Sequence, residues 1–163
     1  MKEPPLDAAD VQSILVVGAG TSGRQIALQF ARFAFDVAVH DIDAAGLQQC
    51  RLWHQASLRA MTDGAVVDRA EVDAILARIS YHADANRAAE SADLLCESIP
   101  EDRQIKRQTL AQLDALCPPR TIFTTNVSYL TPSSLATATK RPERFAAFHF
   151  HVPVWYANAV DVM

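Results

Sequence analysis

Two histidines lie one residue apart near the end of the chain, in the segment "FHFHVPVW" at positions 148–155. In a β-strand His149 and His151 point to the same face, because side chains alternate along a strand with a period of two. Such a pair is compatible with a metal site, with a catalytic base beside a bystander, or with the edge of a core. The chemistry depends on which other residues the fold brings to them.

A glycine-rich segment, "GAGTSG", follows a short apolar run and precedes a helical pattern. Gly18 suits a tight turn, Gly20 leaves room for a pyrophosphate, and Gly23 lets a helix pack closely on a strand. The free N–H groups of a helix start favour phosphate. Asp41 ends the next strand, where a carboxylate accepts hydrogen bonds from an adenosine ribose. Because "HDID" holds no arginine for a 2′-phosphate, the motif predicts NAD rather than NADP.

The hydrophobic pattern predicts strands that alternate with helices, and hence right-handed crossovers between parallel strands. The fold class is therefore α/β, a doubly wound and mainly parallel sheet with helices on both faces. We expect one domain over residues 1–163, with a helical pair inserted at about 43–80. The expected strands are 13–18, 36–41, 79–83, 92–99, 121–126, 144–150 and 159–163, and the expected helices are 23–35, 43–61, 68–78 and 101–117, with a turn at 62–64.

The composition is that of an ordinary soluble globular protein: 50% of the 163 residues are hydrophobic, 21% are charged, and the net charge is -4. The chain has no basic patch, which argues against nucleic acid or an anionic membrane as a partner. Its apolar runs are too short to span a bilayer, and its first residues do not resemble a secretion signal. Three scattered cysteines suit free thiols in a reducing compartment. We therefore expect a cytoplasmic protein.

Four segments, "VVGAGTSGRQIA", "ADLLCESIPEDRQIK", "TIFTTNVSYL" and "RFAAFHFHVPV", together resemble the N-terminal domain of the L-3-hydroxyacyl-CoA dehydrogenases. The resemblance runs over nearly the whole chain. It implies a Rossmann-type fold with NAD as cofactor. It also implies interconversion of an L-3-hydroxyacyl group and its 3-keto form by hydride transfer, as in fatty acid metabolism.

The resemblance also implies roles for single residues. His149 matches the family's catalytic histidine, and Asp161 stands where the family has a glutamate that orients it. Ser128 matches a serine that contacts substrate and cofactor, with a simple turn serine as the alternative. The implied cofactor-binding residues are Gly18, Gly20, Thr21, Ser22, Gly23, Asp41, Ile42, Glu101, Lys106 and Asn126, of which Glu101 and Lys106 would lie near the nicotinamide ribose or, alternatively, on a solvated helix face.

His151 falls where the family carries a phenylalanine. A metal pair would need a third ligand. Asp161 is available, but the remaining histidines (His40, His54 and His82) lie in segments assigned to other parts of the fold, and no cluster with ligand spacing appears. The sequence therefore predicts no metal, with His151 as a packed or edge residue.

Several positions depart from the family pattern. Val152 replaces an active-site asparagine, Tyr129 replaces a second serine, and Asp161 is one methylene shorter than the glutamate. These changes resemble a side branch that includes gulonate dehydrogenases and diketoreductases, whose substrates carry no CoA. An acyl-CoA and a free hydroxy acid both stay open as the substrate. The segment 43–80 carries four arginines and no lysine, where the family is lysine-rich near the CoA phosphates: Arg51, Arg59, Arg69 and Arg78.

The family continues into a helical second domain that covers the substrate and mediates dimerisation. We therefore expect a homodimer formed through that domain, and residues 1–163 alone to bind NAD with little turnover. An NAD-binding module without turnover is the alternative function. The surface that would meet the second domain is expected to expose Phe148, Phe150, Val154 and Trp155.

Overall fold

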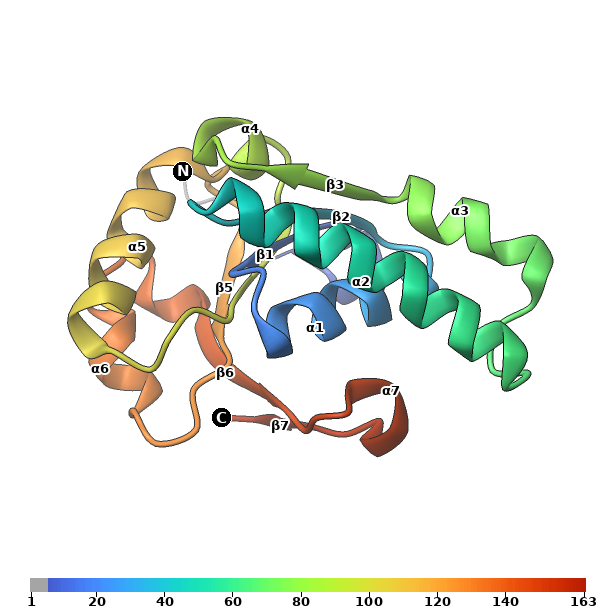
Figure 1. Ribbon diagram of the computed structural model, residues 1–163. Helices are drawn as coiled ribbons and strands as arrows, with labels where there is room; N and C mark the ends of the chain where they lie inside the picture. The colour runs from blue at the N-terminus through green and yellow to red at the C-terminus, as the bar shows by residue number, and fades with distance from the viewer. Residues whose placement is uncertain (1–5) are drawn as a thin grey trace.

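The computed structural model describes residues 6–163, and these form a seven-stranded sheet in the order β3-β2-β1-β4-β5-β6-β7 (Figure 1). Strands β1 to β6 are parallel, and β7 pairs antiparallel with β6 at one edge. The strand order changes direction between β1 and β4, which in sheets of this kind places ligands beyond the carboxyl ends of those strands. The strands are β1 Ser13–Val17, β2 Asp36–His40, β3 Ile79–His82, β4 Leu94–Glu97, β5 Ile122–Thr125, β6 Phe145–Phe150 and β7 Val160–Val162.

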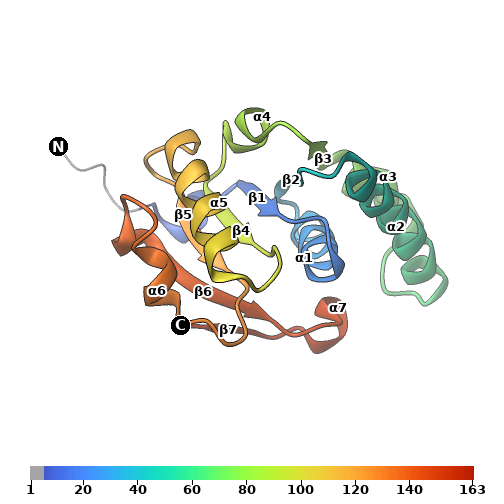
Figure 2. The same ribbon diagram turned by 60° about the vertical axis from the view of Figure 1, so that its left-hand side comes forward.

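Helices cover both faces of this sheet. Figure 2 shows α1, α2 and α3 on one side, with α5 and α6 on the other. The long α2 and the short α3 run alongside each other as an arm (Figure 1). The helices are α1 Thr21–Arg32, α2 Ala44–Asp63, α3 Val72–Ala77, α4 Ala85–Ala89, α5 Arg103–Leu116, α6 Pro132–Ala136 and α7 Val154–Ala157, with 3₁₀ turns at Ala8–Asp10, Arg69–Glu71 and Pro142–Arg144.

Strand β1 lies between two apolar cores. Ile14 and Val16 belong to the core that includes residues of α1 and α2, whereas Leu15 and Val17 belong to the core that includes residues of α4 and α5. This alternation follows from the two-residue period of a strand, and it explains the uninterrupted apolar run in the sequence. The strand is thereby fixed on both faces, and the turn that follows it starts from a rigid position.

The predicted fold class and all seven predicted strands are confirmed. The predicted turn at 62–64 is wrong, because α2 continues through Asp63 and ends at Gly64. The Thr62 hydroxyl donates to the Leu58 carbonyl one turn back, which lets a turn-forming residue stay helical. The sequence did not indicate α4, α6 or α7, which have five, five and four residues and are too short to show a helical period.

The expected exposed patch around α7 is also wrong. Val154 is 3% exposed, and its N–H donates to the Gln25 side chain on α1. Phe150 packs edge-on against Phe30, and Trp155 packs against Trp53. The segment folds back on α1, so its aromatic rings join the core. The exposed apolar side chains near the end of the chain are instead Val152, Tyr156, Val160, Val162 and Met163.

Within residues 6–163 no helix combines the length and apolarity needed to cross a membrane. The three cysteines are free thiols, and all are buried.

His54 is a fully buried polar residue on α2. Its Nδ1 accepts from the Tyr81 hydroxyl at 2.6 Å, and its Nε2 donates to the Arg24 carbonyl at 2.7 Å. Burial lowers the pKa of His54 to about 4, so the imidazole is neutral in the folded protein near pH 7. These bonds tie α2, β3 and α1 together on one face of the sheet.

We expect the free energy of unfolding to fall as the pH drops from 7 towards 4. The unfolded chain protonates His54 near pH 6.5 whereas the folded chain resists until about pH 4, so acid favours unfolding. The loss at pH 5 should be about 2 kcal/mol, which urea unfolding at several pH values measures. A His54→Gln variant should lose this part of the pH dependence. An unchanged pH profile in that variant would contradict the assignment.

Candidate active site

The loop between β1 and α1 needs glycine at two positions for steric reasons. Gly18 has a φ of +105°, and a Cβ there would lie 2.7 Å from the Ser98 carbonyl oxygen. A Cβ on Gly23 would lie 1.9 Å from the Gly18 carbonyl oxygen. Gly20 instead has nothing within 4 Å of its Cβ position, so the loop is open there. This is the space that an approaching phosphate needs, and the start of α1 faces it with free N–H groups.

A cleft of about 650 Å³ lies over this loop and the carboxyl ends of β1, β2 and β4. It contains six of the predicted cofactor residues: Gly18, Gly20, Thr21, Ser22, Asp41 and Ile42, whose side chain is 91% exposed. The open loop, the apolar lining and the terminal carboxylate fit a dinucleotide. The lining residues are Val17, Gly18, Gly20, Thr21, Ser22, His40, Asp41, Ile42, Asp43, Ser98, Ile99, Pro100, Ile105 and Thr109, with no lysine or arginine among them.

Asp41 is held in place by two backbone N–H groups. One carboxylate oxygen accepts from Ala19 N at 2.8 Å, and the other accepts from Asp43 N at 3.0 Å. The first bond connects the end of β2 to the glycine loop. The side chain that is expected to bind the ribose therefore also orders the loop expected to bind the pyrophosphate.

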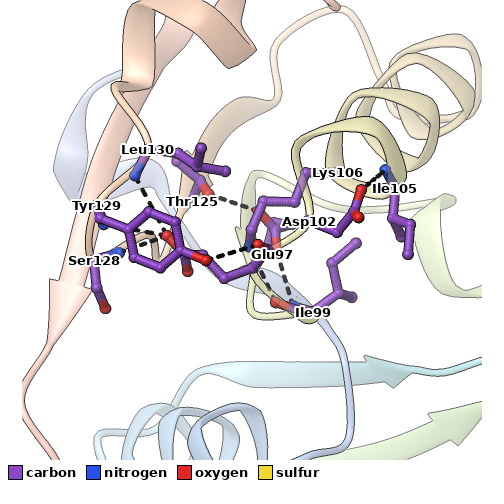
Figure 3. Close-up of polar contacts among 10 residues, drawn as sticks. Glu97, Ile99, Asp102, Ile105, Lys106, Thr125, Ser128, Tyr129 and Leu130 are labelled. Atoms are coloured by element: carbon purple, nitrogen blue, oxygen red, sulfur yellow. Dashed lines mark hydrogen bonds and ion pairs between the residues drawn. The ribbon is translucent and has the colours of Figure 1, made fainter.

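Beside the cleft, a buried ion pair joins β4 to α5. Lys106 Nζ donates to Glu97 Oε1 at 2.6 Å and to the Ile99 carbonyl at 3.0 Å (Figure 3). Glu97 also accepts from Ile99 N and from the Thr125 hydroxyl on β5. Both charged side chains are about 1% exposed or less. The pair fixes the loop after β4, which carries three residues of the cleft wall.

The solvated helix face that the sequence left open for Lys106 is wrong, because its ammonium is enclosed and bonded to Glu97 and Ile99. Lys106 is placed to position the cleft wall.

Glu101 binds the loop that follows β5. Its Oε1 accepts from the backbone N–H groups of Ser128, Tyr129 and Leu130 at 3.0, 3.2 and 3.4 Å (Figure 3). The Tyr129 hydroxyl donates back to the Glu101 carbonyl. A carboxylate that accepts three successive N–H groups is a strong local anchor. Glu101 thus holds Ser128 in its position, and it is not a solvated helix-face residue.

Asn126 performs a similar task for β6. Its Oδ1 accepts from Phe150 N at 2.7 Å, and its own N–H donates to the Glu97 carbonyl. Because β6 is parallel to β5, its carboxyl end, with His149, lies at the same edge of the sheet as the glycine loop. Asn126 thus links the histidine strand to the strand that holds the buried ion pair.

Three polar side chains meet near the end of β6. His149 Nε2 lies 3.2 Å from the Ser128 hydroxyl, and His149 Nδ1 lies 3.7 Å from Asp161 Oδ2. His149 and Asp161 are directly opposite each other in the β6–β7 ladder. The predicted catalytic residues His149, Asp161 and Ser128 are therefore brought together. Their side chains can hold an imidazole between a hydroxyl and a carboxylate, the arrangement of an oriented general base.

His151 is closer to Asp161 than His149 is. Its Nε2 donates to Asp161 Oδ2 at 2.9 Å, and its side chain is 46% exposed. Of the two expectations for His151, a packed or an edge residue, the packed one is wrong, because His151 lies at the surface directly after β6 and has a polar partner. The hydrogen bond from His151 is the main cause that holds the pKa of Asp161 below its usual value, so the carboxylate stays charged.

Sequence reasoning missed Glu97 and Thr125 as parts of the site. The available signal was an acidic residue at the end of the apolar run "DLLCE". A carboxylate in a fully buried strand requires a cation and further hydrogen-bond donors. Lys106 follows Glu97 by nine residues, across a short loop. That argument identifies the pair but not the hydroxyl from β5.

The buried pair gives a direct test. Lys106→Met leaves the Glu97 carboxylate buried without a cation, and we expect it to reduce the free energy of unfolding by about 3–5 kcal/mol. Glu97→Gln should also lower the free energy of unfolding. The double variant should lose less free energy of unfolding than the sum of the two single losses, because no unpaired charge remains. Urea unfolding measures all three, with the exposed Lys140→Met as control. A Lys106→Met loss no larger than that of the control would contradict this role.

Comparison with known proteins agrees with this geometry. Residues 13–163 match the family described as 3-hydroxyacyl-CoA dehydrogenase, NAD binding domain. The chain is 32% identical to a 3-hydroxyadipyl-CoA dehydrogenase of Escherichia coli K12, over 94% of this chain and 32% of that protein. It is 35% identical to a probable 3-hydroxybutyryl-CoA dehydrogenase of Deinococcus radiodurans, over 91% of this chain and 52% of that protein.

Among solved structures, a diketoreductase has a TM-score of 0.88 at 35% identity, and the match covers 94% of this chain and 54% of that one. The chain thus spans about a third to a half of the length of these relatives. The glycine loop, the cleft and the family match agree on the cofactor, which is NAD. The chain belongs to the NAD-binding domain family of the 3-hydroxyacyl-CoA dehydrogenases.

Proposed function

We propose that this domain serves an NAD-dependent dehydrogenase that interconverts an L-3-hydroxyacyl group and its 3-keto form. The observation that carries the proposal is His149, set between the Ser128 hydroxyl and the Asp161 carboxylate. This trio lies at the same sheet edge as the NAD cleft. Bound NAD supplies the hydride acceptor that oxidation of a secondary alcohol needs.

In the proposed reaction His149 Nε2 accepts the proton of the substrate hydroxyl, and it returns that proton when the ketone is reduced. Asp161 Oδ2 lies 3.7 Å from Nδ1 and is placed to orient the ring. Ser128 lies 3.2 Å from Nε2 and is placed to hydrogen-bond the same substrate oxygen. Glu101 keeps Ser128 in position through the Ser128 N–H. Glu101, Lys106 and Asn126 are thus proposed as positioning residues around the cofactor.

Two alternatives to this function remain part of the proposal. The alternative of a substrate without CoA has support from the diketoreductase likeness and from the arginines of the segment 43–80, where the family carries lysines. An NAD-binding module without turnover is the second alternative.

A cytoplasmic location, a role in fatty acid metabolism and a homodimer formed through a helical second domain complete the proposal. Buried free thiols and the absence of a membrane-crossing helix in residues 6–163 are compatible with that location.

The test is NADH formation by the complete gene product with 3-hydroxybutyryl-CoA, free 3-hydroxybutyrate and gulonate, ranked by kcat/KM. The thioester should rank first. His149→Ala should reduce kcat by about 10²–10⁴-fold, because the base is lost, and leave the Kd for NAD nearly unchanged. The matched variant His151→Phe should cost far less, since it frees Asp161 for His149. Preference for a free acid would shift the proposal to the CoA-free class. Equal losses in the two variants would contradict the assignment of His149.

Cofactor choice is a second test. NAD should bind more tightly than NADP, because the Asp41 carboxylate repels a 2′-phosphate and the cleft lining offers no cation. Asp41→Asn removes the charge but keeps an acceptor oxygen for Ala19 N, so the ratio of the two Kd values should shrink by about tenfold. Asp41→Ala should also reduce the ratio of the Kd for NADP to the Kd for NAD. Asp43→Asn is the matched control within the same cleft. Equal Kd values for NAD and NADP in the unaltered protein would remove the argument.

A further inference from the structure

We propose that His149, His151 and Asp161 form a binding site for a divalent transition-metal ion, with zinc as the best fit. Among residues 6–163, these three are the group whose histidine, cysteine or carboxylate ligand atoms gather closely enough, all within 4.8 Å of one another. The sequence predicted no metal because it showed no cluster with ligand spacing, although Asp161 was available. The antiparallel pairing of β7 with β6 places Asp161 beside both histidines.

The geometry suits a small ion. In a tetrahedral zinc site with bonds of about 2.0–2.2 Å, neighbouring ligand atoms lie about 3.4 Å apart. Here Asp161 Oδ2 lies 2.9 Å from His151 Nε2 and 3.7 Å from His149 Nδ1, on either side of that value. With all three ligand atoms within 4.8 Å of one another, an ion can replace the proton between His151 and Asp161 once the side chains adjust. All three side chains are partly exposed, so water can complete the coordination.

The hydrogen bonding around the trio supports His149 Nδ1 as the ligand atom. The other nitrogen of the ring, Nε2, lies 3.2 Å from the Ser128 hydroxyl. Histidines that bind metals commonly have their second nitrogen hydrogen-bonded, because this fixes the ring and its tautomer. Two imidazoles and one carboxylate form a mixed N and O donor set that prefers zinc, nickel or copper over magnesium.

The ion would oppose catalysis, and this consequence alone rests on the proposed function. An ion on Nδ1 leaves the single ring proton of a neutral imidazole on Nε2. That nitrogen then only donates, so His149 can no longer accept the substrate proton. His151 stands where the 3-hydroxyacyl-CoA dehydrogenases resembled in sequence carry a phenylalanine, which offers no ligand atom. The proposed site thus distinguishes this chain from that pattern and makes its base sensitive to zinc.

The first experiment is calorimetric titration of untagged residues 1–163 with ZnCl₂, and separately with MgCl₂. We expect one zinc ion per chain with micromolar affinity and no comparable magnesium binding. His151→Phe and Asp161→Asn should each weaken zinc binding at least tenfold. His82→Phe, at the opposite edge of the sheet, is the matched control and should bind zinc like the unaltered chain. NAD binding and circular dichroism establish that each variant is folded.

Absence of zinc binding would overturn the proposal, as would equal affinities in the unaltered chain and His151→Phe, or a loss in His82→Phe as large as in His151→Phe. The second experiment compares the rate of the complete gene product with and without ZnCl₂. Zinc should inhibit dehydrogenase turnover, and EDTA should reverse the inhibition. The His151→Phe variant should need at least tenfold more zinc for the same fractional inhibition. Zinc binding without any dehydrogenase turnover would refute the proposed function but leave the metal site intact.

Discussion

The buried Glu97–Lys106 pair is the interaction on which the site depends most. Glu97 ends the central strand β4, and its carboxylate bonds to α5 through Lys106, to the following loop through Ile99 N, and to β5 through Thr125. An unpaired charge in this position would be strongly unfavourable, so the three partners must assemble together. The network therefore couples the wall of the NAD cleft to the strand that leads to Asn126 and Ser128.

From this centre a chain of hydrogen bonds reaches β6 beside His149, the proposed base. The Glu97 carbonyl accepts from Asn126 N, and the Asn126 side chain accepts from Phe150 N beside His149. On the other side of the loop, Glu101 gathers three N–H groups and fixes Ser128 (Figure 3). The carboxylates of Glu97 and Glu101 thus accept hydrogen bonds from backbone and side-chain donors. In this way Ser128 and the strand of His149 are positioned by residues that need not contact a ligand. This is the support that a precise site requires.

The short carboxylate of Asp161 on β7 lies near two imidazoles, those of His149 and His151. Asp161 lies opposite His149 in the ladder, yet its Oδ2 bonds to His151, one pleat further along the chain. A side chain one methylene longer would extend further towards the ring that faces it. The same carboxylate therefore serves two imidazoles. The arrangement explains why a modest departure from the family pattern at two positions, His151 and Asp161, creates a cluster of three potential metal ligands.

Much of the fold was determined by the sequence alone. The apolar run at 13–17 specifies a strand buried on both faces, and "GAGTSG" with Asp41 specifies the turn and the cofactor, because these features depend on local sterics and on short spacings. The union of His149, Ser128 and Asp161 was predicted from the family resemblance. Only the tertiary structure decided what depends on pairing between distant segments. It buried Lys106 against Glu97, folded α7 back on α1, and brought Asp161 within hydrogen-bond reach of His151. Side-chain direction across a strand ladder is set by register and chain reversal, and neither is encoded in the spacing of residues along the sequence.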